Sequence, residues 1–450
     1  MGSSIHSFFR YIFFDKRYIT SIAIRFVIIL ITEYLYHNYG VLYTDIDYHV
    51  FSDGAKHITQ FENPYERETY RYTPILAAMM TPNIKIWYPI GKFFLSTIDV
   101  LVGYLIEKLL CVQNQKNNNL KQSLNEIINK DSKLNDYGYA SLFYLYNPLT
   151  VVICTRGSAD CIITFLVLLS LIFLEKKYYF RSALVYGFAV HFKIYPIIYA
   201  PALYLYLVYR EYELPKLSTP SNDDDEKQPR KLDSICSQFL FLMKKFFNTL
   251  RIFIMNLYKL KSLIFITVSA STFFFFLIVF YVWIGYKFLY EYLLYHIVRK
   301  DHRHNYSMFY YLIYLTYDSE FSKLLSFIAF LPQMSLIGLV TFFLYKKINL
   351  CLIILTMIFV AFNKVMTAQY FIWFFSLIPL IVKNNNLFST KKVKGFILLL
   401  IWLFFEIIWN QYSHELEFNG KNTFIEMWIV DIIFFIINCV CIKEIIVNNN

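Results

Sequence analysis

Apolar stretches long enough to cross a lipid bilayer recur along most of this chain. A membrane-spanning helix needs roughly 20 mainly apolar residues, and segments of this kind are expected at 20–39, 93–112, 137–153, 160–174, 182–192, 195–209, 262–284, 322–345, 348–363, 366–382, 394–411 and 427–447. Because 57% of the 450 residues are hydrophobic, the chain has more apolar surface than a soluble domain could bury. The sequence predicts an all-α polytopic membrane protein with about ten to twelve spans. Several segments in the first half are short, which leaves open whether they are re-entrant or paired half-spans.

Basic residues in short loops predict which way the chain crosses the membrane, because they favour the cytosolic side. The clusters that set the orientation are Arg10, Lys16 and Arg17, the lysines of 113–135, Lys176, Lys177 and Arg181, Lys346 and Lys347, Lys391, Lys392 and Lys394, and Lys443. They predict cytosolic N- and C-termini and lumenal or exterior loops at 41–92, 156–160, 285–321 and 413–426. Basic cytosolic loops account for much of the net charge of +11, so no nucleic-acid partner is needed to explain it.

The chain reads as one membrane domain, 1–450, with two polar cytosolic loops. Residues 113–135 are rich in Asn and Lys, and the loop 210–261 contains a charged, low-complexity stretch, so neither can bury enough apolar surface to order itself. Seven cysteines form no CxxC pair of the metal-binding type, and most lie inside predicted spans. A disulfide framework is therefore not expected. One Asn-x-Ser sequon stands at Asn305, where closeness to the membrane could block glycosylation.

A crowded polar passage, Tyr43 to Asn83, follows the first predicted span. Charged groups beside hydrocarbon are costly unless they face water or a partner, so Asp45 and Asp47 become candidates for chemistry. The D-x-D pattern alone is weak, because it also occurs at 223–225 in the polar cytosolic loop. What favours Asp45 and Asp47 is their place beside a span on the predicted lumenal side. The chain has no P-loop and no G-x-G-x-x-G pattern, so a lipid-linked donor is more plausible than a soluble nucleotide.

Six further blocks, together with this passage, resemble one enzyme family in order along almost the whole chain. They are YNP at 146–148, TRGSAD at 155–160, GFAVHFKIYP at 187–196, YHIVRKDHRHNYS at 295–307, FNKVMTAQYFIWF at 362–374 and FNGKNTF at 418–424. The sequence is similar to the glycosylphosphatidylinositol (GPI) mannosyltransferase 1 family. The resemblance implies a GT-C-like helical bundle in the endoplasmic-reticulum membrane with lumenal catalytic loops. It implies transfer of the first mannose, in an α1,4 linkage, from dolichyl-phosphate mannose to glucosaminyl-phosphatidylinositol or its acylated form, with a small single-span subunit as partner. Ser158 departs from the Asn that the family often has there.

The candidate site residues follow from this chemistry. A sugar on a lipid phosphate already has a good leaving group, so the protein mainly has to deprotonate the acceptor hydroxyl and neutralise the phosphate. We expect Asp45 to be the base of an inverting reaction and Asp47 to position the acceptor, although the two roles could be reversed. The expected substrate-binding residues are Arg71, His191, Lys193, Arg299, His302, Arg303, His304, Lys364 and Gln369. No cofactor or metal ion is expected, because a lipid-phosphate leaving group does not require the divalent ion that a nucleotide diphosphate recruits.

Other interpretations of these residues stay open. The His/Arg run at 299–304 could be an interfacial helix, and Lys193 and Lys364 could be helix-end residues that reach toward the headgroups. Arg156 and Asp160 could form a simple ion pair on one helix face. A different dolichol-dependent glycosyltransferase and, less plausibly, a transporter are alternative functions. Helices lying in the membrane plane are expected near 48–60 and 287–304.

Overall fold

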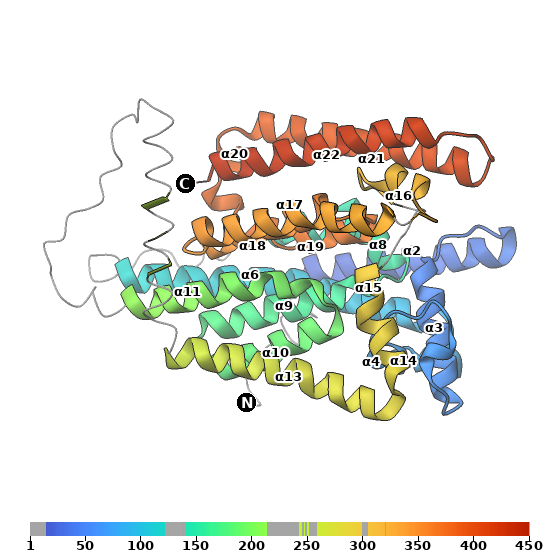
Figure 1. The fold of residues 1–450 in the computed structure, drawn as a ribbon, viewed down its shortest axis with the longest axis horizontal. Coiled ribbons are helices and arrows are strands. Elements are labelled where there is room, and N and C mark those ends of the chain that lie inside the picture. The colour runs from blue at the N-terminus through green and yellow to red at the C-terminus, as the bar shows by residue number, and fades with distance from the viewer. Residues whose placement is uncertain are drawn as a thin grey trace, which may run out of the picture.

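The protein is a helical bundle whose long helices lie roughly along one common axis (Figure 1). The computed structural model describes residues 15–121, 138, 140–213, 243–244, 247, 250–251, 259–298, 305–319 and 321–449. The longer helices are α2 (Lys16–Tyr39), α6 (Ile90–Lys121), α9 (Asp160–Glu175), α10 (Tyr179–Phe192), α11 (Ala200–Glu213), α13 (Leu260–Ile284), α17 (Phe321–Leu344), α18 (Ile348–Ala361), α21 (Lys392–Glu417) and α22 (Phe424–Val447). Within these ranges the regular elements are helices, apart from one isolated β-bridge. The prediction of an all-α polytopic membrane protein is confirmed.

Short helices collect at one end of the bundle, on the right of Figure 1, where α3, α14 and α15 cross the direction of the long helices. They are α3 (Ile46–Thr59), η1 (Pro64–Glu66), α4 (Pro74–Met79), α5 (Thr81–Lys85), α14 (Tyr286–Leu289), the π-helix η4 (Tyr290–Leu294), α15 (Tyr295–Val298) and α16 (Tyr310–Leu315). The predicted crosswise helix at 48–60 is present. The one predicted at 287–304 is present to 298, and its remainder lies outside the described residues.

Four described helices are long and apolar enough to cross a membrane, namely α2, α13, α21 and α22. A fifth span is possible if α8 (Pro148–Thr155) and α9 form one broken span, since they meet at 119°. This bend fits the expectation that some segments of the first half are re-entrant or paired half-spans. Shorter apolar helices lie at Ile328–Leu344, Ile348–Ala361 and Ala368–Leu380, so the count of ten to twelve spans stays a prediction. Helix α6 runs on to Lys121, so the first part of the loop expected at 113–135 is helical instead.

Remaining short elements connect the long helices. They are η2 (Tyr195–Tyr199), η5 (Ala368–Tyr370), α19 (Phe371–Phe375), η6 (Ile378–Leu380), η7 (Val382–Asn384) and α20 (Asn386–Ser389). Helix α20 lies at the opposite end of the bundle from α3, near the C-terminus (Figure 1). Among the described residues, the predicted lumenal segments 41–92 and 413–426 lie toward the end that carries α3, whereas the predicted cytosolic segments at 346–347 and 391 lie toward the end that carries α20 (Figure 1).

Several helices are preceded by a residue whose side chain caps the first turn by accepting a hydrogen bond from a backbone N–H. Asp15 accepts a hydrogen bond from the backbone N–H of Arg17 at the start of α2. Asn147 precedes Pro148 and accepts from Leu149, so the Asn-Pro pair of the YNP block starts α8. Such residues satisfy N–H groups that have no partner within the helix, and proline fits the first position because its missing N–H is not needed there.

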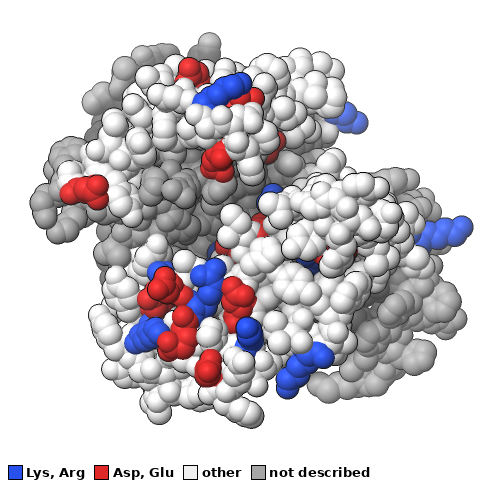
Figure 2. Space-filling view, turned by 90° about the vertical axis from the view of Figure 1, so that its right-hand side faces the viewer, with Lys and Arg blue, Asp and Glu red and all other residues white. Residues whose placement is uncertain are grey.

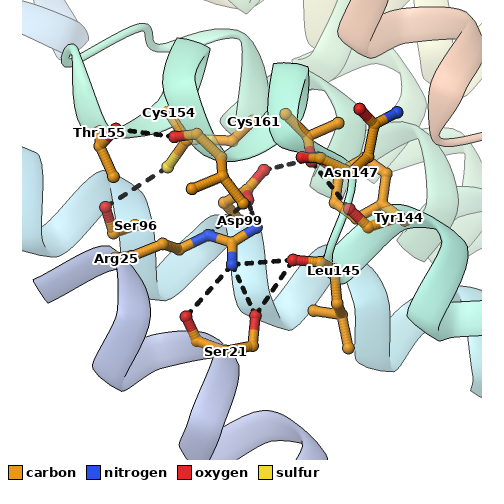
Figure 3. A network of polar contacts seen from close by, with 12 residues as sticks. Ser21, Arg25, Ser96, Asp99, Tyr144, Leu145, Asn147, Cys154, Thr155 and Cys161 are labelled. Atoms are coloured by element: carbon orange, nitrogen blue, oxygen red, sulfur yellow. Dashed lines mark hydrogen bonds and ion pairs between the residues drawn. The ribbon is translucent and has the colours of Figure 1, made fainter. Parts of the chain in front are cut away.

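A buried ion pair joins α2, α6 and the helical residues 140–145 that precede α8 (Figure 3). Arg25 and Asp99 have fully buried side chains, and their Nη2 and Oδ2 atoms are 2.7 Å apart. Tyr144 donates to the other oxygen of Asp99 at 2.6 Å, and Arg25 donates to the Ser21 hydroxyl and the Leu145 carbonyl at 2.6 and 3.0 Å. Charges away from water are tolerated when they are paired and hydrogen-bonded in this way. The pair therefore sets how these three elements are placed relative to one another.

Asn305 is expected to carry no N-linked glycan. Its side chain is fully buried. Its amide nitrogen donates to the Lys364 carbonyl at 3.0 Å, while its oxygen accepts from the N–H groups of Ser307 and Met366. Glycosylation joins the sugar to that buried nitrogen. Treatment of the expressed protein with an amide-cleaving glycosidase should leave its electrophoretic mobility unchanged.

The control is an exposed site on the same predicted side of the membrane. Lys421→Thr creates the sequon Asn419-Gly420-Thr in the exposed turn between α21 and α22. This variant should migrate more slowly and return to the wild-type position after glycosidase, provided that the turn is lumenal. A glycosidase-sensitive shift in the wild-type protein would contradict the burial of Asn305.

Candidate functional site

The segment that carries Asp45 is hydrogen-bonded to the break between α8 and α9. The N–H of Asp45 donates to the Arg156 carbonyl at 2.9 Å. The Tyr43 hydroxyl lies 2.7 Å from that of Thr155, and Arg156 Nε donates to the Tyr43 carbonyl at 3.1 Å. Two segments that are over 100 residues apart in the sequence are thereby fixed side by side.

Gly157 permits this close approach. Its φ of +100° lies in the region that favours glycine, and a Cβ atom there would lie 2.5 Å from the Tyr48 ring. Any side chain would push Tyr48, and with it the start of α3, away from the break. The backbone conformation and the close contact with Tyr48 therefore explain why the TRGSAD block has a glycine at position 157.

Asp45 is both the cap of α3 and a strong candidate for a base. Its carboxylate accepts from the N–H of Asp47 at 3.1 Å. Burial, followed by the nearby Asp47 carboxylate, raises the pKa of Asp45 to about 6, although Arg156 opposes the rise. Near neutral pH the group is therefore mostly ionised and holds a proton more tightly than an ordinary aspartate.

Asp47 lies at one end of a chain of polar contacts that leads into the bundle. Gln369 Nε2 donates to Asp47 Oδ2 at 2.9 Å. The Ser158 hydroxyl lies 3.2 Å from Gln369 Oε1 and 3.2 Å from Asp160 Oδ2. The predicted lumenal loop 41–92, the α8–α9 break and η5 are therefore joined by these hydrogen bonds.

Asp160 in turn holds Lys193 at the end of α10. The Lys193 ammonium donates to Asp160 Oδ1 at 2.5 Å, and Trp373 Nε1 donates to the same oxygen at 3.0 Å. Lys193 also lies 4.9 Å from the Trp373 ring centroid and 5.3 Å from that of Tyr370. Burial alone lowers the pKa of Lys193, but Asp160 outweighs it and holds the pKa above its ordinary value. A charged ammonium is therefore held near Asp47, which lines the same small cavity.

A small cavity lies among these groups. Its volume is about 20 Å³, and its polar lining comes from Asp47, Asp160, Lys193 and Gln369, with apolar walls that include Phe51. A space of this size holds about one water molecule. We therefore expect a sugar to lie at the mouth of the cavity or to displace the lining side chains.

The end of the molecule around this site carries many charged side chains (Figure 2). Ion pairs on α3, η1 and α14 include Arg67 with Asp53 at 2.8 Å and Lys287 with Glu66 at 3.0 Å. Because acidic and basic groups pair there, the described residues of this surface show no strong excess of one sign.

Of the predicted substrate-binding residues, Lys193 and Gln369 come together with Asp47, whereas His191 lies elsewhere. The His191 side chain is fully buried, stacks on Phe276 and Phe280, and has its Nε2 3.1 Å from the Thr73 hydroxyl. Its ring faces α13 and the start of α4, so its observed contacts are those of a packing residue.

Arg71 and Lys364 also lie apart from the cavity. Arg71 forms an ion pair with Glu291 and lies 4.0 Å from the centroid of the Tyr295 ring, which ties the first loop to the π-helix and α15. Lys364 is half-buried, and its carbonyl accepts from Asn305. Arg299, His302, Arg303 and His304 lie outside the described residues.

The interpretation of Arg156 and Asp160 as an ion pair on one helix face is wrong. The helix breaks between them, so Arg156 ends α8 and Asp160 begins α9 in another direction. Arg156 contacts the Tyr43 carbonyl, and Asp160 pairs with Lys193 instead. Sequence reasoning missed the role of Asp160 and of Trp373, although both lie in blocks that carry the family resemblance.

A protein metal site of the usual composition is not found in the part of the chain that the structure describes, where no group of three or more His, Cys, Asp or Glu side chains could hold an ion. The His/Arg run at 299–304 falls outside that part. Independence from metal ions stays a prediction.

Comparison with known proteins gives consistent similarities. A family model described as "Mannosyltransferase (PIG-M)" matches residues 153–222 and 232–446. This match includes Ser158, Asp160, Lys193, Gln369 and Trp373 of the site.

Full-length relatives are similar over nearly the whole chain. "GPI mannosyltransferase 1" of Dictyostelium discoideum is 34% identical over 445 residues, covering 96% of this chain and 91% of the relative. The Candida albicans protein of the same name is 35% identical over 95% of this chain and 97% of its own length. "GPI alpha-1,4-mannosyltransferase I, catalytic subunit" of Danio rerio is 31% identical over 94% of each chain.

Proposed function

The chain belongs to the PIG-M mannosyltransferase family, and from this premise we propose that it transfers the first mannose in the synthesis of GPI anchors. The acceptor is glucosaminyl-phosphatidylinositol, with or without an acyl chain on the inositol, and the new linkage is α1,4, as the name of the Danio rerio relative indicates. The donor is dolichyl-phosphate mannose. The observation that carries the proposal is similarity above 30% identity along more than nine-tenths of the chain.

In the proposed mechanism Asp45 accepts the proton of the attacking acceptor hydroxyl. The hydroxyl oxygen bonds to the anomeric carbon of mannose from the face opposite the phosphate, and the bond from that carbon to the phosphate oxygen breaks. Dolichyl phosphate leaves, and the configuration inverts. The raised pKa of Asp45 supports this role because a base works best when its pKa lies near the working pH.

In this mechanism Asp47 binds the acceptor and Lys193 binds the phosphate of the donor, and both side chains line the same small cavity. The hydrogen bond from Gln369 orients Asp47, so that its other oxygen can receive an acceptor hydroxyl. Lys193, which Asp160 keeps charged, supplies a cation for the phosphate that leaves. Arg299 and Arg303 remain proposed as further phosphate ligands on the ground of their chemistry.

The direct test supplies the chain to membranes that lack their own activity, together with labelled dolichyl-phosphate mannose and either form of glucosaminyl-phosphatidylinositol. The expected product is a singly mannosylated acceptor whose label a mannosidase of the appropriate linkage removes. If no transfer occurs even when the single-span partner is co-expressed, the proposal is wrong, and the alternative is a dolichol-dependent glycosyltransferase that acts on a different acceptor.

The rate of transfer should fall as the pH drops through about 6. Asp45 accepts a proton only when it is ionised, and its pKa is raised to about 6. Between pH 7.5 and pH 5 the ionised fraction, and with it the rate, should fall about tenfold. The measurement is the initial rate at saturating donor, with recovery at pH 7.5 as the control for damage. A rate that stays level down to pH 5 would argue against an ionised Asp45 as the base.

The proposed setting is the endoplasmic-reticulum membrane, with both termini cytosolic and the Asp45 site lumenal. The described residues of the predicted lumenal segments 41–92 and 413–426 lie toward the opposite end of the bundle from those of the predicted cytosolic segments at 346–347 and 391, which supports this orientation (Figure 1). The Lys421→Thr glycosylation variant tests it, since only a lumenal turn is modified. A small single-span protein is the proposed partner subunit.

A further inference from the structure

Lys92 lies in a place that is unfavourable for a cation. It is the third residue of α6, and the first turn of a helix carries a partial positive charge. Only 1% of its side chain is exposed, so it does not reach toward lipid headgroups as lysines beside a span commonly do. A buried ammonium is costly unless it is paired and hydrogen-bonded. Its partners therefore indicate what this lysine does.

The Lys92 ammonium joins two segments of the chain. Its Nζ atom donates to Glu33 Oε1 of α2 at 2.6 Å and to the Thr44 hydroxyl at 2.7 Å. Glu33 is itself buried, and it supplies the opposite charge that allows the ammonium to stay away from water. Thr44 directly precedes Asp45. One hydrogen bond of the ammonium is therefore made to the segment that carries the proposed base.

The same ammonium also contacts the first turn of α3. It lies 5.5 Å from the centroid of the Tyr48 ring, within the range of a cation–π contact. The N–H of Tyr48 donates to the Asp45 carbonyl at 3.1 Å, and the Tyr48 hydroxyl donates to the Tyr88 carbonyl at 2.6 Å. Lys92 thus contacts Thr44, which precedes Asp45, and Tyr48, which follows it by three residues.

The contacts at the α8–α9 break hold the two neighbours of Thr44. Arg156 donates to the Tyr43 carbonyl at 3.1 Å, and its own carbonyl accepts from the Asp45 N–H at 2.9 Å. The bond from Lys92 adds the Thr44 side chain, so that three consecutive residues are each anchored to another part of the bundle. A general base benefits from such anchoring, because a displacement of about 1 Å can cost about 10²-fold in rate.

We propose that Lys92, paired with Glu33, is a positioning residue for mannose transfer and holds the Asp45 carboxylate toward the acceptor hydroxyl through its bond to Thr44. This inference rests on the function proposed above and adds a role in the same reaction. Lys92 is not among the described residues that line the small cavity. It therefore acts through Thr44 and not by contact with a substrate.

The test compares Thr44→Val with Thr44→Ser. Valine has nearly the size of threonine but no hydroxyl, whereas serine keeps the hydroxyl that accepts from Lys92. Thr44→Val should lower kcat about tenfold to a hundredfold and change the KM for either substrate little, because a displaced base weakens only the transition state. Thr44→Ser should stay close to the wild-type rate.

The pH profile separates positioning from a loss of folded protein. Burial, followed by Asp47, raises the pKa of Asp45 to about 6, with Asp160 adding to the rise and Arg156 opposing it. If the segment loosens in Thr44→Val, Asp45 becomes less buried and its pKa falls toward the ordinary value. The ratio of the rate at pH 5 to the rate at pH 7.5 should then rise above the wild-type ratio. A smaller amount of folded protein would lower both rates equally.

Matched variants locate the effect. Lys92→Met together with Glu33→Gln leaves no charge unpaired and should give the same fall in kcat; if it does not fold, the two Thr44 variants decide. The control is Thr59→Val, which removes a hydroxyl bonded to the Lys56 carbonyl at the far end of α3 and should leave the rate unchanged. Wild-type kcat in Thr44→Val, or an equal loss in Thr44→Ser, would overturn the positioning role alone. No transfer by the wild-type chain would overturn the proposed function and this inference with it.

Discussion

Asp45→Asn is expected to lower the rate of mannose transfer by about 10²- to 10⁴-fold, the usual contribution of a general base. The substitution keeps the size of the side chain and removes only its ability to take up a proton. Asparagine caps helices about as well as aspartate, so the bond to the Asp47 N–H and the start of α3 should survive. The contact from the Asp45 N–H to the Arg156 carbonyl involves the backbone and should also survive.

The control for this result is Asp53→Asn on the same helix. Asp53 is a half-exposed carboxylate of α3 that pairs with Arg67 at the surface, and its replacement should leave the rate close to that of the wild type. Asp47→Asn completes the comparison, since a large loss there with full activity in Asp45→Asn would reverse the two roles. Rates should be compared at equal amounts of folded protein, measured by size-exclusion chromatography.

Arg25→Met is expected to lower the free energy of unfolding by about 3–5 kcal/mol. The loss arises because Asp99 would stay buried without its cation, and an uncompensated buried charge is costly. Tyr144 would still donate to Asp99, but a neutral hydroxyl does not replace a guanidinium. The measurement is the unfolding equilibrium of the full chain in mixed micelles titrated with a denaturing detergent.

The double variant Arg25→Met with Asp99→Leu separates charge from packing. It removes both charges and should recover a good part of the lost stability, because replacing a buried ion pair with apolar groups is often close to neutral. Arg67→Met, which breaks a partly exposed pair at the surface, should change stability little, since solvent screens the two charges. A single Arg25→Met variant as stable as the wild type would show that the pair is not needed to hold the bundle together.

Most helices follow directly from the sequence. The segment expected at 160–174 is observed as Asp160–Glu175, and that expected at 262–284 as Leu260–Ile284. Such agreement has a simple cause: a run of apolar residues needs its backbone hydrogen bonds satisfied within the segment, and in lipid only a helix does so locally. The same local reasoning found the Asp45 and Asp47 pair, because charge beside a span is visible in one window of residues.

The sequence by itself thus determined an all-helical membrane protein, the positions of its long helices and the family resemblance. The surroundings of the site were decided by the tertiary structure. Gln369 reaches Asp47 across 322 positions of sequence, and Trp373 reaches Asp160 across 213. The 119° break that turns Asp160 toward Lys193 and the burial that pairs Arg25 with Asp99 depend on how helices pack. Periodicity and composition describe each helix alone, whereas these contacts exist only once the helices lie against one another.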